Sequence, residues 1–415
     1  MIAHQATSAA AAPRPARPGR SAVAGSPAAP RPPRRRRRGG IRAPWWFVLP
    51  AIAAYLFIVV VPSVNGAFYS FTDWNGLRPD WSFVGFGNFT AVFTDRGARA
   101  ALVNTVSTPD SEEAMKLEGV LFFPVTPFGA DGGVDEGALA KHVENGIAAG
   151  AGGVFVACGT GEFHALTPAE IECCARIAVT AAAGRVPVYA AAGGPLPVAL
   201  DHVERLGRVG VDGVLLLPPY LVGGPQRGVF DYVRAVAGAT SLRVIFYQRG
   251  NAVPTPRTAV EIARIPNVVG IKDGVGNIEL MHRTVLTVRR AVSEEFQFFN
   301  GLPTAEMTVP AYLGIGVPLY SSAVFAFAPE IALRFHRAVT TDDTETVRVL
   351  LAEFYLPLVE LRDEVPGYAV ALIKAGVRLR GLDVGGVRPP LLDPTTEHVD
   401  RLETLLQHGL ELADR

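Results

Sequence analysis

Short runs of apolar residues recur from residue 119 onward, separated by segments in which apolar residues repeat with helical spacing. Most runs end in a cluster of small or polar residues. Continuous apolar runs are typical of parallel strands that are buried on both faces, whereas half-exposed strands would alternate. The pattern therefore predicts eight buried parallel strands, beginning at residues 119, 153, 187, 213, 243, 268, 296 and 318.

The segments between these strands have the pattern of helices that cover a sheet. In residues 168–183, for example, the side chains at 171, 174, 175 and 178 fall on one face. Eight strand–helix units in succession predict an α/β fold of the (β/α)8 barrel type. We assign residues 112–335 to the barrel. Residues 336–415, helical except for a loop at 381–394, form a predicted carboxy-terminal helical extension.

The first 111 residues have a different pattern. Residues 1–40 consist mainly of Ala, Pro, Arg, Ser and Gly, which predicts a disordered basic tail. Within residues 41–111, the stretch 44–62 contains no charged side chain and is close to the length of a membrane span. A transmembrane helix is predicted there, preceded by arginines and starting with two tryptophans. A buried core helix and a signal-peptide core are the alternatives.

Composition excludes several classes of function. The 39 basic and 39 acidic residues give no net charge, so nucleic acid is not an expected partner. The three cysteines include an adjacent pair and form no Cys/His cluster, which supports neither a metal site nor a disulfide framework. No GxGxxG motif follows a strand, so no dinucleotide site is predicted. We expect neither a metal nor an organic cofactor.

Candidate catalytic residues lie where predicted strands end, because barrel enzymes place their active sites at the carboxyl ends of the strands. Helix capping accounts for many polar residues there, but not for Lys272, Tyr247 or Arg249. A desolvated lysine has a lowered pKa and attacks ketones to form an imine. Tyr247, one strand away, is a candidate for proton transfer. A surface lysine and an ordinary core tyrosine are the alternatives.

A glycine-rich turn after the second predicted strand is the candidate anion site. Backbone N–H groups of Gly159 and Gly161, with the hydroxyl of Thr160, could hold a substrate carboxylate at the start of a helix.

The amino-terminal region resembles part of a transporter. Residues of about 35–107, including YSFTDWNG and FVGFGNF, resemble the amino-terminal part of a sugar ABC transporter permease. The remaining spans of a permease are absent, and one span cannot form a translocation path. Transport is therefore rejected, and we interpret the chain as a permease fragment fused to a complete enzyme, either by genomic rearrangement or through an error of genome assembly or gene calling.

The region from about 117 to 413 has a second and more extensive resemblance. It includes GTGEFHALTPAE, FYQRGN, GIKDGVGN, NGLPTAE and PLYSSAVFAFAPEIA. These motifs are similar to the dihydrodipicolinate synthase and N-acetylneuraminate lyase superfamily, and within it to the 5-dehydro-4-deoxyglucarate dehydratases. The resemblance implies a class I aldolase-type barrel with Lys272 as the Schiff-base lysine and Tyr247 as its acid/base partner. It also implies that the turn at 159–162 binds the carboxylate of a keto acid.

Two positions depart from the superfamily pattern. Gly159 stands where the synthases have the first of two adjacent threonines, and Gln248 stands where an asparagine is usual. The first departure argues against dihydrodipicolinate synthesis, since a relay through two threonine hydroxyls cannot form.

The dehydratase resemblance implies a small keto sugar diacid as substrate, which would lose water and carbon dioxide. Arg249 is the candidate ligand of the distal carboxylate, since a guanidinium binds one bidentately; a structural salt bridge is the alternative. Asn300, Ser321 and Ser322 are candidates for contacts with substrate hydroxyls, with capping as their alternative.

Assembly and location are also expectations. The resemblance implies a homo-oligomer. A sugar-acid catabolic enzyme with free cysteines is expected in the cytoplasm, with membrane association only through residues 44–62. Two other functions stay open: another Schiff-base lyase or synthase acting on pyruvate-type keto acids, and a non-catalytic, membrane-tethered sugar-acid binding protein.

Overall fold

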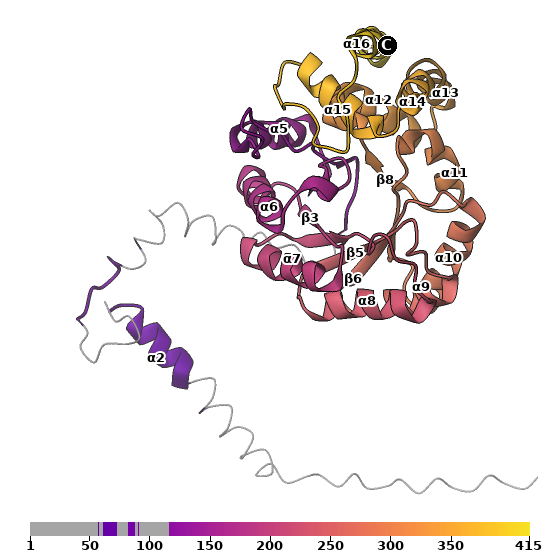
Figure 1. Cartoon of the computed structure of the whole chain (residues 1–415). Helices are drawn as coiled ribbons and strands as arrows, with labels where there is room; N and C mark the ends of the chain where they lie inside the picture. Colours follow the sequence, from indigo (N-terminus) through magenta and orange to yellow (C-terminus); the bar gives the residue numbers. More distant parts are fainter. Residues whose placement is uncertain (1–56, 58–60, 73–81, 88–89, 91–115) are drawn as a thin grey trace, which may run out of the picture. The chain divides into compact units, whose positions relative to one another are not determined.

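The computed structural model describes residue 57 and residues 61–72, 82–87, 90 and 116–415 (Figure 1). The chain divides into two compact units, Met1–Ala100 and Ala101–Arg415. The predicted tail at 1–40 lies outside the described residues.

Part of the first unit contains regular structure. Helix α2 (Val61–Tyr69) begins inside the predicted span and continues past residue 62, where that span was expected to end. Beyond it, Phe71 stacks on Phe83 and meets Phe86 edge to face. Of the predicted span at 44–62, all but residues 57, 61 and 62 lie outside the described part of the chain. No described helix is long and apolar enough to cross a membrane.

The second unit contains a closed barrel of eight parallel strands in chain order, in which β8 pairs with β1. All eight strands predicted from the apolar runs are confirmed. They are β1 (Leu121–Phe122), β2 (Gly153–Val156), β3 (Val188–Ala192), β4 (Gly213–Leu216), β5 (Arg243–Gln248), β6 (Val268–Asp273), β7 (Gln297–Asn300) and β8 (Leu319–Ser322).

Helices surround the barrel and cover the outer face of its strands (Figure 1). Their first turns are often capped: Asp135, Thr167, Thr255 and Asn277 each accept a hydrogen bond from a backbone N–H of the helix that follows. Such caps stabilise a helix by about 1 kcal/mol and fix where it begins. The helices are α5 (Glu136–Ala149), α6 (Pro168–Ala182), α7 (Leu196–Val209), α8 (Gln226–Gly238), α9 (Pro256–Ala263), α10 (Ile278–Ala291), α11 (Val309–Gly314) and α12 (Pro329–Thr340).

Aromatic side chains fill the barrel interior. Phe155 lies between Phe123 and Tyr189, with nearly parallel rings whose centroids are 4.7 and 4.9 Å apart. All three side chains are almost fully buried, so the stack forms an apolar layer inside the barrel.

The carboxy-terminal extension is helical, as predicted, and its long loop separates the last two helices. The last barrel helix, α12, ends at Thr340 and so runs past the expected boundary at 335. The elements that follow are α13 (Thr344–Leu350), a π-helical turn η7 (Leu351–Tyr355), α14 (Leu356–Asp363), α15 (Tyr368–Leu379) and α16 (Thr396–Ala413).

A buried ion pair attaches this extension to the turn that follows β2. The Nζ atom of Lys374, on α15, lies 2.7 Å from Oε1 of Glu162, and both side chains are fully buried. The other carboxylate oxygen of Glu162 accepts the backbone N–H of Arg388, and the guanidinium of Arg388 pairs with Glu170. The extension therefore supports the loops at the carboxyl end of the barrel.

Candidate active site

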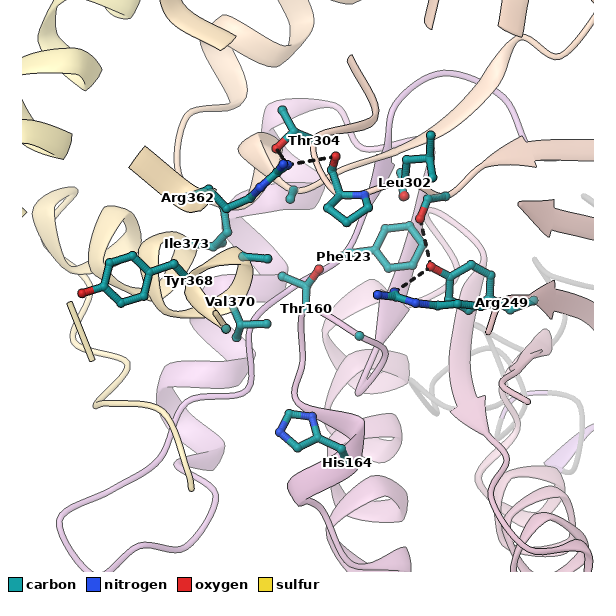
Figure 2. Close-up of a pocket in the computed structure, with 18 of the residues that line it drawn as sticks. Phe123, Thr160, His164, Arg249, Leu302, Thr304, Arg362, Tyr368, Val370 and Ile373 are labelled. Atoms are coloured by element: carbon teal, nitrogen blue, oxygen red, sulfur yellow. Dashed lines mark hydrogen bonds between the residues drawn. The ribbon is translucent and has the colours of Figure 1, made fainter. Parts of the chain in front are cut away.

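A cavity of about 400 Å³ lies at the carboxyl ends of the strands. Strand-end and loop residues line one part of it, and α14, α15 and the turn between them line the rest. Phe123, Thr160, Arg249, Arg362 and Tyr368 come from widely separated parts of the chain and surround the same space (Figure 2).

Lys272 projects into this cavity from β6, opposite Tyr247 of β5 in the sheet register. Its side chain is almost fully buried, with Nζ 3.9 Å from the ring centroid of Phe123 and 4.8 Å from that of Tyr247. Gly301 permits this position, because a Cβ atom there would lie 2.5 Å from Cε of Lys272. Burial lowers the pKa of Lys272 to about 7. Much of the amine is therefore unprotonated and nucleophilic near neutral pH.

The ring of Tyr247 lies next to the amine, and its hydroxyl has two partners of its own. The hydroxyl donates to the carbonyl of Gly301 at 2.9 Å and accepts from Nη1 of Arg249 at 3.1 Å. Burial raises the pKa of Tyr247, and the neighbouring Arg249 opposes that rise. A protonated phenol with both a donor and an acceptor partner is suited to passing protons in either direction.

The glycine-rich turn after β2 contributes only part of its residues to the cavity. Gly159 and Thr160 line it, but Gly161 does not. The carbonyl of Gly161 accepts from the hydroxyl of Thr126, and a Cβ at this glycine would lie 2.9 Å from Cα of Ala157. Gly161 therefore permits close packing of the turn, while a Cβ at Gly159 would meet no atom within 4 Å.

Of the three residues expected to contact substrate hydroxyls, only Ser321 lines the cavity. Ser322 is fully buried and its hydroxyl donates to Glu306. The Asn300 amide donates to the carbonyl of Ala305 and the hydroxyl of Thr308, so it shapes the loop after β7.

Sequence reasoning missed Arg362, which reaches the cavity from the end of α14 (Figure 2). Its Nη1 atom donates to the carbonyl of Pro303 at 3.1 Å and to Oγ1 of Thr304 at 2.9 Å. Nothing in the local sequence of a helical extension distinguishes this arginine from the solvated ones around it. Only the placement of α14 against the loop after β7 brings it into the site.

The cavity is electrostatically one-sided. Arg249, Lys272 and Arg362 line it, and the lining residues of the described chain include no Asp or Glu. An anionic ligand is therefore favoured. In the part of the chain that the structure describes, no group of three or more His, Cys, Asp or Glu side chains is placed to hold a metal ion.

A closed (β/α)8 barrel with a buried lysine at the end of β6 and a tyrosine next to it on β5 defines the class of lysine-nucleophile, aldolase-type barrels. The profile of the dihydrodipicolinate synthetase family matches residues 116–409, and the chain belongs to this family.

Curated relatives and solved structures agree with this assignment. The chain is 55% identical over 309 residues to the probable 5-dehydro-4-deoxyglucarate dehydratase 1 of Streptomyces coelicolor, covering 74% of this chain and 98% of the relative. It is 43% identical to the corresponding probable enzyme of Azotobacter vinelandii, over 72% of this chain and 98% of that one. The structure of YagE, a prophage protein of E. coli K12 solved with pyruvate, superimposes with a TM-score of 0.64 at 26% identity, covering 71% of this chain and 99% of that one.

Proposed function

We propose that the chain is a decarboxylating dehydratase that converts 5-dehydro-4-deoxy-D-glucarate to 2,5-dioxopentanoate, carbon dioxide and water. The observation that carries the proposal is the buried amine of Lys272, with its pKa of about 7, next to the ring of Tyr247 in a cavity lined by cationic groups. The relatives with more than half of their residues identical bear the name of this activity.

The first step joins Lys272 to the substrate ketone. The neutral amine attacks the ketone carbon, the ketone oxygen leaves as water, and a protonated imine forms. Tyr247 gives the proton that the departing oxygen needs and takes one from the amine. The imine nitrogen then acts as an electron sink for the carbons beside it.

The second step eliminates the hydroxyl group at the β-carbon. A base removes a proton from the methylene group next to the imine, which gives an enamine. The enamine electrons expel the β-hydroxyl as water and leave a carbon–carbon double bond conjugated with the imine. Tyr247 is the candidate for both proton transfers, since its ring lies next to the Lys272 amine and its hydroxyl is bonded to Gly301, which lines the same cavity.

The third step removes the distal carboxylate as carbon dioxide. The electrons of the broken carbon–carbon bond pass through the conjugated chain to the imine nitrogen. Protonation and tautomerisation give an aldehyde, and hydrolysis of the imine releases the keto acid and frees Lys272. Over the whole reaction the dianion takes up one proton and yields a monoanion, carbon dioxide and one water molecule.

The turn after β2 is the candidate site for the substrate carboxylate that is adjacent to the ketone. Gly159 and Thr160 line the cavity, and their backbone N–H groups and the Thr160 hydroxyl could hold the carboxylate beside the reacting carbon. Ser321 is the remaining candidate for a substrate hydroxyl. A relay through two adjacent threonines cannot form, because Gly159 occupies the first position.

Two assays with the full chain test the function. Borohydride reduction in the presence of the substrate should add the mass of the bound keto acid to Lys272, and Lys272→Met should abolish the adduct. Carbon dioxide release from 5-dehydro-4-deoxyglucarate should then depend on the same amine. An adduct without carbon dioxide release would reject the dehydratase and leave a pyruvate-type lyase or synthase. Binding without any adduct would reject both enzymes and favour a sugar-acid binding protein.

The amino-terminal region is proposed to play no part in catalysis. The compact unit Ala101–Arg415 contains the whole barrel and its extension, and the family match begins at residue 116. We propose that residues 41–111 are a fused permease-like fragment, and that the catalytic domain works in the cytoplasm as a homo-oligomer. Residues 112–415 expressed alone should be folded and active. An insoluble or inactive product would contradict this division of the chain.

A further inference from the structure

Arg362 is the least expected of the cationic groups in the cavity, because it comes from the carboxy-terminal extension. Its side chain is only 18% exposed. Besides the two bonds from Nη1 to the loop after β7, its Nε donates to Asp363 at 2.7 Å. These bonds fix the plane of the guanidinium. No described residue accepts a hydrogen bond from Nη2, so that donor remains for a ligand in the cavity.

The neighbouring carboxylate of Asp363 does not neutralise this site. Its side chain is 61% exposed, and an ion pair with so exposed a partner is screened by solvent. Arg362 therefore presents a rigid, largely uncompensated charge to the cavity.

Arg249 occupies a different place in the site. Its Nη1 donates to the hydroxyl of Tyr247, and its charge contributes to lowering the pKa of Lys272. It is therefore close to the carbon that bonds to the amine, where a 2-keto acid carries its first carboxylate. Arg249 and Arg362 approach the cavity from different sides (Figure 2).

We propose that Arg362 binds the distal carboxylate of the substrate and thereby selects keto diacids over keto monoacids. This inference rests on the proposed function only for the identity of the diacid. It replaces Arg249 as the ligand of that group. Arg249 instead acts near the imine, through its hydrogen bond to Tyr247.

A binding assay independent of turnover tests the proposal. Lys272 is trapped with borohydride over a range of concentrations of 2-oxoadipate, a six-carbon keto diacid, or of 2-oxohexanoate, which lacks only the distal carboxylate. Wild-type protein is expected to reach half-maximal trapping at about 10- to 100-fold lower concentration of the diacid, the range of a charge-assisted hydrogen bond. Arg362→Gln should remove this preference while leaving the trapping of 2-oxohexanoate unchanged.

Matched variants separate binding from folding. Arg362→Lys keeps the charge and should retain part of the preference. Arg401→Gln removes another arginine of the extension, paired with Glu364 outside the cavity, and should behave as wild type. Unchanged trapping of the monoacid shows that the site is folded in each variant.

Two outcomes would overturn the proposal: no preference in the wild type, or a preserved preference in Arg362→Gln. In the second case, loss of the preference in Arg249→Gln would assign the distal carboxylate to Arg249. The proposed reaction fails separately. If the preference depends on Arg362 but no carbon dioxide is released from 5-dehydro-4-deoxyglucarate, the carboxylate site stands and the dehydratase assignment falls.

Discussion

Replacing the proposed nucleophile, Lys272→Met, is expected to stabilise the protein, and by an amount that depends on pH. Burial lowers the pKa of Lys272 from its ordinary 10.5 to about 7 in the folded chain. Between these two pH values the unfolded chain holds a proton that the folded chain has lost. The difference between the two pKa values corresponds to a destabilisation of the folded wild type by about 5 kcal/mol. This penalty is present in full below pH 7 and absent above pH 10.5.

The interval between pH 7 and pH 9 sets the direction and the magnitude of the expected change in stability. At pH 7 the penalty is about 4 kcal/mol, and at pH 9 it has fallen to about 2 kcal/mol, because the unfolded chain binds its proton less strongly. The wild type should therefore gain about 2 kcal/mol relative to Lys272→Met as the pH rises through this interval. Methionine has a similar shape and no ionisable group, so the variant lacks this term.

Chemical unfolding of the two proteins at several pH values measures the effect. The free energy of unfolding of the variant minus that of the wild type should shrink steadily between pH 7 and about pH 9. Lys141→Met, at an exposed lysine on α5, serves as the control and should show no such trend. A difference that stays constant with pH would mean that the amine is not desolvated, and the account of its nucleophilicity would be wrong.

Three further substitutions test other parts of the site. Tyr247→Phe removes the hydroxyl of the ring next to the amine and should lower kcat by about 10²- to 10⁴-fold, while borohydride trapping of Lys272 persists; an unchanged kcat would exclude it as the proton carrier. Gly159→Thr adds a side chain where a Cβ meets no atom within 4 Å. The variant should unfold at the same temperature as the wild type. Relative to the wild type, it should lose more affinity for the six-carbon diacid than for pyruvate, and equal losses for the two ligands would contradict the prediction. Lys374→Met leaves the buried Glu162 unpaired and should lower the free energy of unfolding by about 3–5 kcal/mol, with Glu162→Gln restoring part of it; additive losses in the double variant would argue against the pair.

The barrel could be predicted because its strands are buried on both faces and therefore stand out as uninterrupted apolar runs. Lys272 and Tyr247 stood out for the same reason, since each is a chemically distinct side chain at the end of such a run. The register confirms that the two lie opposite one another on neighbouring strands.

Which of Asn300, Ser321 and Ser322 line the cavity depends on the alternation of side chains along a strand. Neighbouring residues of a strand point to opposite faces, so Ser321 and Ser322 cannot both line the cavity. The same rule separates Phe299, in register with Lys272, from Asn300, in register with Asp273. Because alternation is a property of every strand, the sequence alone could have shown that Ser321 and Ser322 point to opposite faces.

Arg362 depends instead on contacts with the loop at Pro303 and Thr304, far away in the chain. No local pattern records such an approach, because amphipathic spacing tells which face of a helix is buried but not which loop it meets. The position of Arg362 in the cavity therefore could not be predicted from the sequence.

The attachment of the carboxy-terminal extension to the β2 turn also has a consequence for synthesis. The barrel strands precede the extension in the chain, so they leave the ribosome before Lys374 and Arg388 do. Until then the turn lacks the partners of Glu162, and α14 and α15 do not yet line the cavity into which the amine projects. Water on that side of the cavity would favour the protonated amine, so we expect Lys272 to become fully reactive only after the extension has folded.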